Sequence, residues 1–258
     1  MLSPRQFHDL TEQMGKQFIE NPGDFVTETD LQLLMVSEIR EALSGSSSGN
    51  NPRFEIDSGS IFKQAYIDSV EDGYHHKGID PVHTEVSLEK GERIDIGVFG
   101  TPQPTAHWDN GSKKFDAKDF DALFELKFVK NHKKPPTTTG FTPYQDRNTH
   151  YGQGTLQSAI DWEDIGVKED IEALGKRTSV PYRAVLVFSN FNYYYHRPTQ
   201  MEVDHAPLYE DLGDVAWDMI QRVGNDMDVN VLYVAPELPG AGRGGGPCGG
   251  LEWIYEAI

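Results

Sequence analysis

The amino-acid sequence predicts an α/β domain in which helices flank a mixed central sheet. Three observations indicate this class: an amphipathic helix pattern near the N-terminus, three segments in which apolar and polar residues alternate, and two later apolar runs. The alternating segments are typical of strands with one buried face, and the apolar runs are typical of strands buried on both faces. The predicted order of the main elements is α, β, β, β, α, β, α, β, which begins with an αβββαβ core; a short helix and a C-terminal edge strand are expected in addition.

The first helix is expected over residues 27–43, where apolar residues recur at helical spacing. Thr27 and Asp30, three residues later, are typical of a capping box at the start of such a helix. Further helical segments are expected at three places along the chain: residues 60–70, 156–175 and 208–223.

Strands are predicted at six places. Alternation indicates the first three, apolar runs indicate the next two, and a short alternating segment near the C-terminus indicates an edge strand. In chain order they are residues 82–88, 93–99, 123–129, 182–189, 230–235 and 251–255. A Pro-, Gly- and Asn-rich insertion, residues 100–118, separates the second strand from the third.

The length of the chain, 258 residues, suits one large domain. We expect a single domain over residues 1–258, with its core at residues 25–235 and a Gly-rich tail at residues 236–258. The lone Cys248 excludes an intrachain disulfide framework and a Cys₄ or Cys₂His₂ zinc site. No apolar run approaches the roughly 18 residues of a transmembrane helix. We therefore expect a soluble, cytoplasmic protein with no membrane partner.

The net charge of −18 usually argues against nucleic-acid binding, because phosphate attraction supplies most non-specific affinity. The lysines, however, are unevenly distributed. Residues 113–134 hold seven lysines and four acids, a net charge of +3, which leaves −21 for the rest of the chain. Lys130, Lys133 and Lys134 are therefore candidate nucleic-acid contacts. A cytoplasm at molar salt, where the Debye length is about 3 Å, is a second interpretation of the acidity.

Two of the predicted strands combine ionisable and large apolar residues. One contains Asp95, and another contains Glu125 and Lys127. Alternation places their apolar neighbours on one face of the sheet and these three side chains on the other. Two carboxylates can hold Mg²⁺ or Mn²⁺, which would activate water at a phosphodiester, while a lysine supplies positive charge or helps to deprotonate the water. Ion pairs on surface strands are the alternative interpretation.

The pattern of Asp95 followed by Glu125-x-Lys127 resembles that of the PD-(D/E)xK, or restriction-endonuclease-like, nuclease superfamily, whose core is αβββαβ. The resemblance covers about residues 25–190. It implies that Asp95 and Glu125 are metal ligands and that Lys127 is a catalytic residue.

In this superfamily the first helix often supplies a further glutamate. The resemblance therefore implies a catalytic role for Glu28, with Glu38 as the rival candidate. The sequence departs from the family pattern in two ways: the interval between Asp95 and Glu125 is long, and no proline precedes Asp95.

Other candidates have weaker support from the sequence. Glu85 could add a metal ligand, and Gln157 could contact a phosphate or a base. Tyr193–Tyr195 could stack on bases, although packing is the commoner role of such a run. Residues 240–245 match G-x-G-x-x-G, but no helix follows, so we interpret them as part of the tail.

Together these observations predict a metal-dependent nuclease, with a DNA endonuclease as the expected form and a homodimer as a further expectation. The alternative is an acidic, non-catalytic binding protein or DNA mimic. A mimic should spread its carboxylates along an exposed face, whereas an enzyme should gather them at one site.

Overall fold

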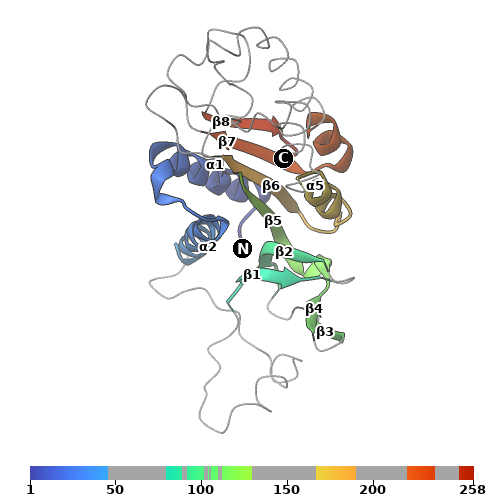
Figure 1. Cartoon of the computed structure of the whole chain (residues 1–258). Coiled ribbons are helices and arrows are strands. Elements are labelled where there is room, and N and C mark those ends of the chain that lie inside the picture. The colour runs from blue at the N-terminus through green and yellow to red at the C-terminus, as the bar shows by residue number, and fades with distance from the viewer. Residues whose placement is uncertain are drawn as a thin grey trace, which may run out of the picture.

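The protein has an α/β fold in which helices flank a mixed six-stranded sheet (Figure 1). This arrangement is seen in a computed structural model, which describes residues 1–45, 80–88, 92–101, 104, 106–109, 112–129, 167–189, 220–235 and 250–258. The elements are, in chain order, α1 (Pro4–Glu20), η1 (Pro22–Asp24), α2 (Glu28–Ser44), β1 (Val82–Ser87), β2 (Arg93–Phe99), β3 (Ala106–Asp109), β4 (Ser112–Phe115), η3 (Ala117–Asp119), β5 (Phe120–Val129), α5 (Val167–Gly175), β6 (Tyr182–Ser189), β7 (Asn230–Ala235) and β8 (Gly250–Tyr255).

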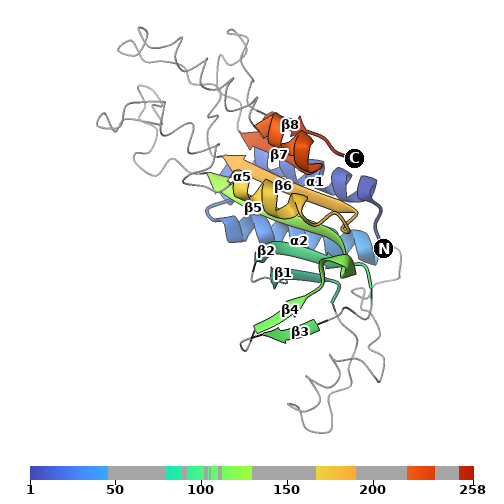
Figure 2. The same cartoon turned by 90° about the vertical axis from the view of Figure 1, so that its right-hand side faces the viewer.

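The strand order in the sheet is β1-β2-β5-β6-β7-β8. Strands β5, β6 and β7 run parallel, and the strands at both edges run antiparallel to their neighbours. α5 follows β5 and crosses one face of the sheet before β6, as the turned view shows (Figure 2). β3 and β4 form a separate hairpin in the predicted insertion. The predicted αβββαβ order is therefore confirmed, with a hairpin added between its second and third strands.

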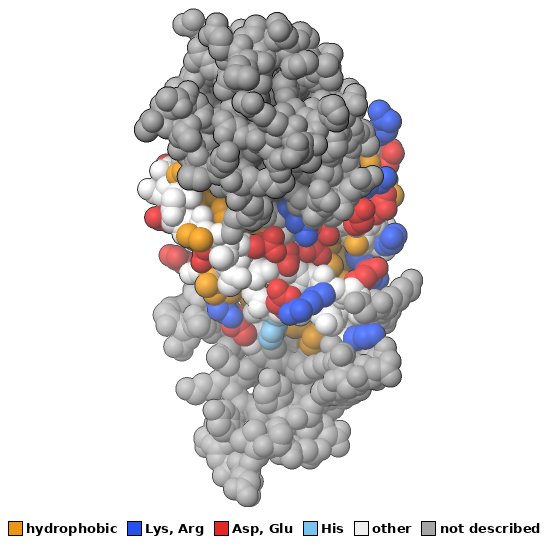
Figure 3. Space-filling view, in the orientation of Figure 1, with side chains coloured by type: hydrophobic (Ala, Val, Ile, Leu, Met, Phe, Trp, Pro, Cys, Tyr) orange, Lys and Arg blue, Asp and Glu red, His pale blue; other side chains and the backbone are white. Residues whose placement is uncertain are grey.

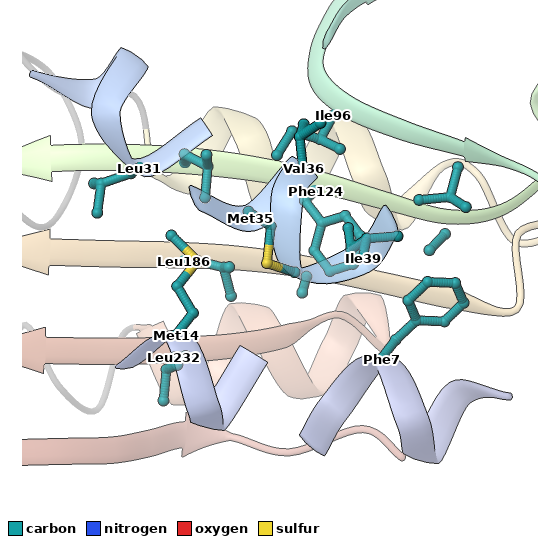
Figure 4. Close-up of a cluster of buried hydrophobic side chains, with 14 of the residues drawn as sticks. Phe7, Met14, Leu31, Met35, Val36, Ile39, Ile96, Phe124, Leu186 and Leu232 are labelled. Carbon is teal, nitrogen blue, oxygen red and sulfur yellow. The ribbon is translucent and has the colours of Figure 1, made fainter. Parts of the chain in front are cut away.

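Helices cover both faces of the sheet. On one face α1 and α2 bury Phe7, Met14 and Met35 against Phe124 and Leu186 of the strands (Figure 4). On the other face α5 and the helical residues 220–227 pack on a second apolar cluster. Because each face is covered, the central strands are apolar on both sides, which explains the continuous apolar runs of β6 and β7.

α1 was not expected, since the sequence analysis placed its first helix at residue 27. It begins with a capping box between Ser3 and Gln6, and its apolar side includes Phe7 and Phe18, both buried. α1 and β8 both belong to the described core, although both lie outside the expected core range of residues 25–235.

The predicted boundaries of the other elements agree closely with the structure. α2 begins at Glu28 with the predicted capping box of Thr27 and Asp30. β5 begins at Phe120, three residues before the predicted start, because pairing with β2 extends to that residue. The helix predicted at 156–175 ends as expected at Gly175 of α5, but its residues 156–166 lie outside the described residues. The helix expected at residues 60–70, and most of the helix expected at 208–223, also lie outside them.

Candidate active site

The predicted site residues lie where the pairing between two neighbouring strands, β2 and β5, ends and leaves a gap in the sheet. β2 pairs with β5 from Phe99↔Phe120 as far as Ile96↔Phe124, and no pairing follows. Beyond that point two amide groups of β5 donate hydrogen bonds to side chains. The amide of Leu126 donates to Asp95 Oδ2 at 2.7 Å. The amide of Phe128 donates to Glu28 Oε2 at 3.3 Å. Carboxylates therefore replace the missing strand partner on this side of β5.

Asp95 is held through both of its oxygens. While Oδ2 accepts from the β5 backbone, Oδ1 accepts from Gln32 Nε2 at 3.1 Å. Gln32 is itself buried on α2, and it also lies 3.5 Å from Glu85 Oε1. Each oxygen of Asp95 therefore accepts a hydrogen bond from the β5 backbone or from Gln32. Because a carboxylate oxygen has two lone pairs, two further positions remain, and Glu125 is hydrogen-bonded at one of them.

Glu125 is the most deeply buried carboxyl group of the site, at 5% exposure. Burial, the negative charges of Asp95 and Asp170, and a hydrogen bond to Asp95 together raise the pKa of Glu125 to about 10. Its carboxyl group is therefore protonated at neutral pH and donates that hydrogen bond. Asp95 and Glu125 consequently face each other across the gap, as predicted.

Lys127 lies on the same side of β5 as Glu125, and its ammonium Nζ is 2.8 Å from Asp170 Oδ2 on α5. Burial alone would lower the pKa of Lys127, but the attraction of Asp170, Glu125 and Asp95 outweighs it and raises that pKa. Burial also raises the pKa of Asp170 to about 6 despite the ion pair. The surrounding carboxyl groups contribute to both shifts, because Asp95 raises the pKa of Lys127 and also that of Asp170.

Glu28, and not Glu38, is the helix carboxylate that reaches the site. It stands in the first turn of α2, where burial and the charge of Asp95 raise its pKa. Glu38 accepts from Gln13 Nε2 at 2.8 Å and from Gln17 Nε2 at 3.0 Å, both on α1. The predicted alternative is thus resolved by geometry, since Glu38 joins the two helices to each other.

One prediction about the strand faces is wrong. Ile94 and Ile96 were expected on the same face, but Ile94 packs in the cluster beneath α5 and Ile96 in the cluster beneath α1 and α2. Val82 and Val86 of β1 differ in the same way. In β1 the positive φ of Glu85, 55°, lies between Val82 and Val86 and interrupts the regular alternation. β2 changes face between the residues that pair with this part of β1, at Thr84↔Ile96 and Val86↔Ile94. The site is therefore a gap within a sheet covered on both sides, and not the open face of a half-buried sheet.

Glu85 and Asp95 lie between two paired positions of β1 and β2, Thr84↔Ile96 and Val86↔Ile94. It forms an ion pair with Arg93 and is linked to Asp95 through Gln32. Its position is at the margin of the site, and its side chain is more exposed than that of Glu125. Figure 3 shows Asp and Glu side chains gathered in a band across the middle of this face of the molecule.

Several residues singled out in the sequence cannot be placed. These are Lys130, Lys133, Lys134, Gln157, Tyr193–Tyr195, the glycine-rich residues 240–245 and Cys248, all of which lie outside the described residues. Lys118 is a described lysine of the lysine-rich residues 113–134. It forms an ion pair with Asp116, in which Nζ lies 3.0 Å from Oδ2.

Sequence reasoning missed two residues of the site, Gln32 and Asp170. Gln32 comes one helical turn after Glu28, a spacing that places both on one side of α2. Asp170 stands among three other charged residues of α5, and only the rotation of that helix on the sheet distinguishes it from them.

Asp95 and Glu125 fit a small divalent cation. In the described part of the chain, no three His, Cys, Asp or Glu side chains form a ready-made metal cage. Mg²⁺, however, is usually held by one or two carboxylates, with waters and substrate phosphates completing its shell. The two facing carboxyl groups meet that requirement once Glu125 loses its proton, and the excess of acids favours a cation.

Comparisons of this chain with models of protein families, with curated proteins and with solved structures found no match. No helix in the described ranges is both long and apolar enough to cross a membrane.

Proposed function

We propose that this protein is a divalent-cation-dependent nuclease that hydrolyses phosphodiester bonds, with DNA as the expected substrate. One observation carries the proposal: the chain brings Glu28, Asp95 and Glu125, which are far apart in sequence, to one gap beside Lys127. This is the set of residues that the resemblance to PD-(D/E)xK nucleases implies. The αβββαβ order of the elements supports the same assignment.

Asp95 and Glu125 would hold the cation, Mg²⁺ or Mn²⁺. A cation bound there would polarise the scissile phosphate and lower the pKa of a water. Asp95 is already oriented by Leu126 and Gln32, so little side-chain freedom remains to be lost on binding. Glu125 would release its proton to become a ligand, as metal binding generally requires.

Lys127 would stabilise the negative charge that develops on the phosphate. Its ion pair with Asp170 favours the charged ammonium. A charged ammonium can donate hydrogen bonds but cannot accept a proton. Of the two roles considered for this lysine, electrostatic stabilisation is therefore better supported than deprotonation of the water.

The burial of the carboxyl groups argues against an acidic DNA mimic. A mimic would present its carboxylates to solvent in place of phosphates. Here Glu125 is almost fully buried, and Glu28 and Asp95 accept hydrogen bonds from the backbone of β5. These contacts favour a converging site over a displayed acidic surface.

Cleavage assays with the full chain test the proposal. Plasmid DNA, single-stranded DNA and RNA would be incubated with Mg²⁺, Mn²⁺ or EDTA over a range of salt concentrations. We expect cleavage that needs the cation, is abolished in Glu125→Gln and persists in Glu38→Gln, the matched glutamate outside the site. Cleavage that resists EDTA, or no cleavage of any of these substrates with either cation, would contradict the proposal.

A further inference from the structure

The ion pair between Lys127 and Asp170 suggests a role for a residue that the nuclease pattern does not include. We propose that Asp170 is a positioning residue, which holds the Lys127 ammonium away from Glu125 and Asp95 and so leaves their oxygens free for the cation. This inference rests on the proposed function, because it concerns the same site.

The position of Asp170 supports this role. It projects from α5, which packs on one face of the sheet, whereas Glu28 comes from α2 on the opposite face. Lys127 Nζ lies 2.8 Å from Asp170 Oδ2, whereas Glu125 and Asp95 act on the same ammonium through their charge. The carboxylate that binds the lysine is thus not one of the two assigned to the cation.

Because the ion pair of Lys127 and Asp170 is largely shielded from solvent, it matters to the site which carboxylate binds the lysine. The side chains of Lys127 and Asp170 are 20% and 18% exposed. Removing one partner of a largely buried ion pair is destabilising, because the remaining charge is left uncompensated. Without the charge of Asp170, Lys127 would turn toward Asp95, whose negative charge already attracts it, and toward the neighbouring Glu125. It would then occupy, as an internal cation, the oxygens that Mg²⁺ or Mn²⁺ requires.

A double-mutant cycle distinguishes this role from direct binding of the cation by Asp170. The affinity for Mn²⁺ would be measured by calorimetry on the full chain for wild type, Asp170→Asn, Lys127→Met and the double variant. Asp170→Asn should weaken Mn²⁺ binding at least about fivefold when Lys127 is present. The same substitution should change the affinity less than about twofold in the Lys127→Met background. Asp170→Glu, which keeps the charge, should recover most of the wild-type affinity.

Two results would overturn the inference. An equal loss of affinity in both backgrounds would mean that Asp170 acts on the cation itself, and no loss beside Lys127 would mean that it does not position the lysine. Should Asp170→Asn fail to fold, Asp170→Ser, which leaves room for water beside the ammonium, takes its place in the cycle.

Parallel cleavage assays separate this inference from the proposed function. A wild-type protein that binds Mn²⁺ with the expected coupling but cuts no nucleic acid would contradict the nuclease and support the role of Asp170. A wild-type protein that cuts, with no coupling in the cycle, would overturn the role of Asp170 alone. Absence of Mn²⁺ binding by the wild type would overturn both.

Discussion

The two sides of strand β5 differ, and the difference locates the site. On one side β5 pairs with β6 in parallel along most of its length, from Ala122↔Tyr182 to Val129↔Ser189. On the other side pairing with β2 ends at Phe124, and the amides of Leu126 and Phe128 bind carboxylates instead. Buried backbone amides need acceptors, and a strand normally supplies them. In β5, carboxylates from distant parts of the chain accept these hydrogen bonds, and this holds them in the position where we propose that a cation binds.

The largest effect is expected from Asp95→Asn, which changes the open side of β5. The two donors contact different oxygens of Asp95, and in asparagine an NH₂ group replaces one of them, so a donor would face either the amide of Leu126 or Gln32 Nε2. Asparagine also lacks the charge that a cation needs. We expect cleavage to fall at least about 10³-fold and the free energy of unfolding to fall by about 1–3 kcal/mol.

The matched control is Asp121→Asn, a part-buried carboxyl group near the opposite end of β5. It should leave cleavage within about twofold of wild type, as measured by initial rates on the same substrate. Equal loss in both variants would show that the gap has no special role.

Lys127→Met should have the next largest effect. It keeps the buried stem of the side chain and removes the charge, so the turnover number should fall on the order of 10²-fold. Lys168→Met is the control, because Lys168 lies on α5 with its Nζ 3.9 Å from Glu172 and is half exposed. Steady-state kinetics on one DNA substrate would compare the two, and undiminished turnover in Lys127→Met would remove the assigned role.

Glu28→Gln should have a smaller effect than either. A glutamine can still accept from the amide of Phe128, so the fold of the gap should survive while one negative charge is lost. We expect about a tenfold fall in cleavage, which is typical of residues that support a metal site. Glu38→Gln, on the same helix, should change the rate less than twofold. A rate for Glu38→Gln below that of Glu28→Gln would reverse the assignment of the helix glutamate.

The smallest effect concerns the pH dependence of stability without added cation. Because the pKa of Glu125 is raised to about 10 from 4.5, the folded state binds more protons than the unfolded state between these pH values. Its contribution to stability is full below pH 4.5 and is lost as the pH rises toward 10. Glu125→Gln does not titrate, so wild type should lose at least about 1 kcal/mol more than this variant between pH 6 and pH 9.

Denaturant unfolding in EDTA measures this difference. The range from pH 6 to pH 9 lies at or above the pKa of Asp170, which is about 6, so Asp170 is ionised through most of it. Parallel pH profiles for the two proteins would contradict the buried, protonated state of Glu125. Addition of Mn²⁺ should stabilise wild type more at pH 9 than at pH 6, because a ligand that binds only the folded state raises its stability.

The sequence predicted the positions of most helices and strands along the chain better than the way in which they pack together. Alternation in β2 and the apolar runs of β6 and β7 give strands directly, because burial repeats with the period of the backbone. The change of face at Ile94 was missed, because the alternation of residues gives no sign of where a strand changes face. α1 was missed although its capping box, formed by Ser3 and Gln6, is local in sequence.

The candidate site residues could be predicted where they lie within recognisable strands. Glu125 and Lys127 are two residues apart in β5, so the strand pattern places them on one side, and Asp95 was found through its position in β2. Gln32 and Asp170 could not be found in this way, because their role depends on how α2 and α5 are rotated on the sheet.

A crystal of the full chain soaked in Mn²⁺ would test the central claim most directly. Anomalous diffraction would locate the ion without reference to activity. The account predicts a peak in the gap between β2 and β5, with ligands from Asp95 and Glu125, and its disappearance in Asp95→Asn. A peak elsewhere, or an empty gap in which Glu125 still donates its hydrogen bond to Asp95, would contradict it.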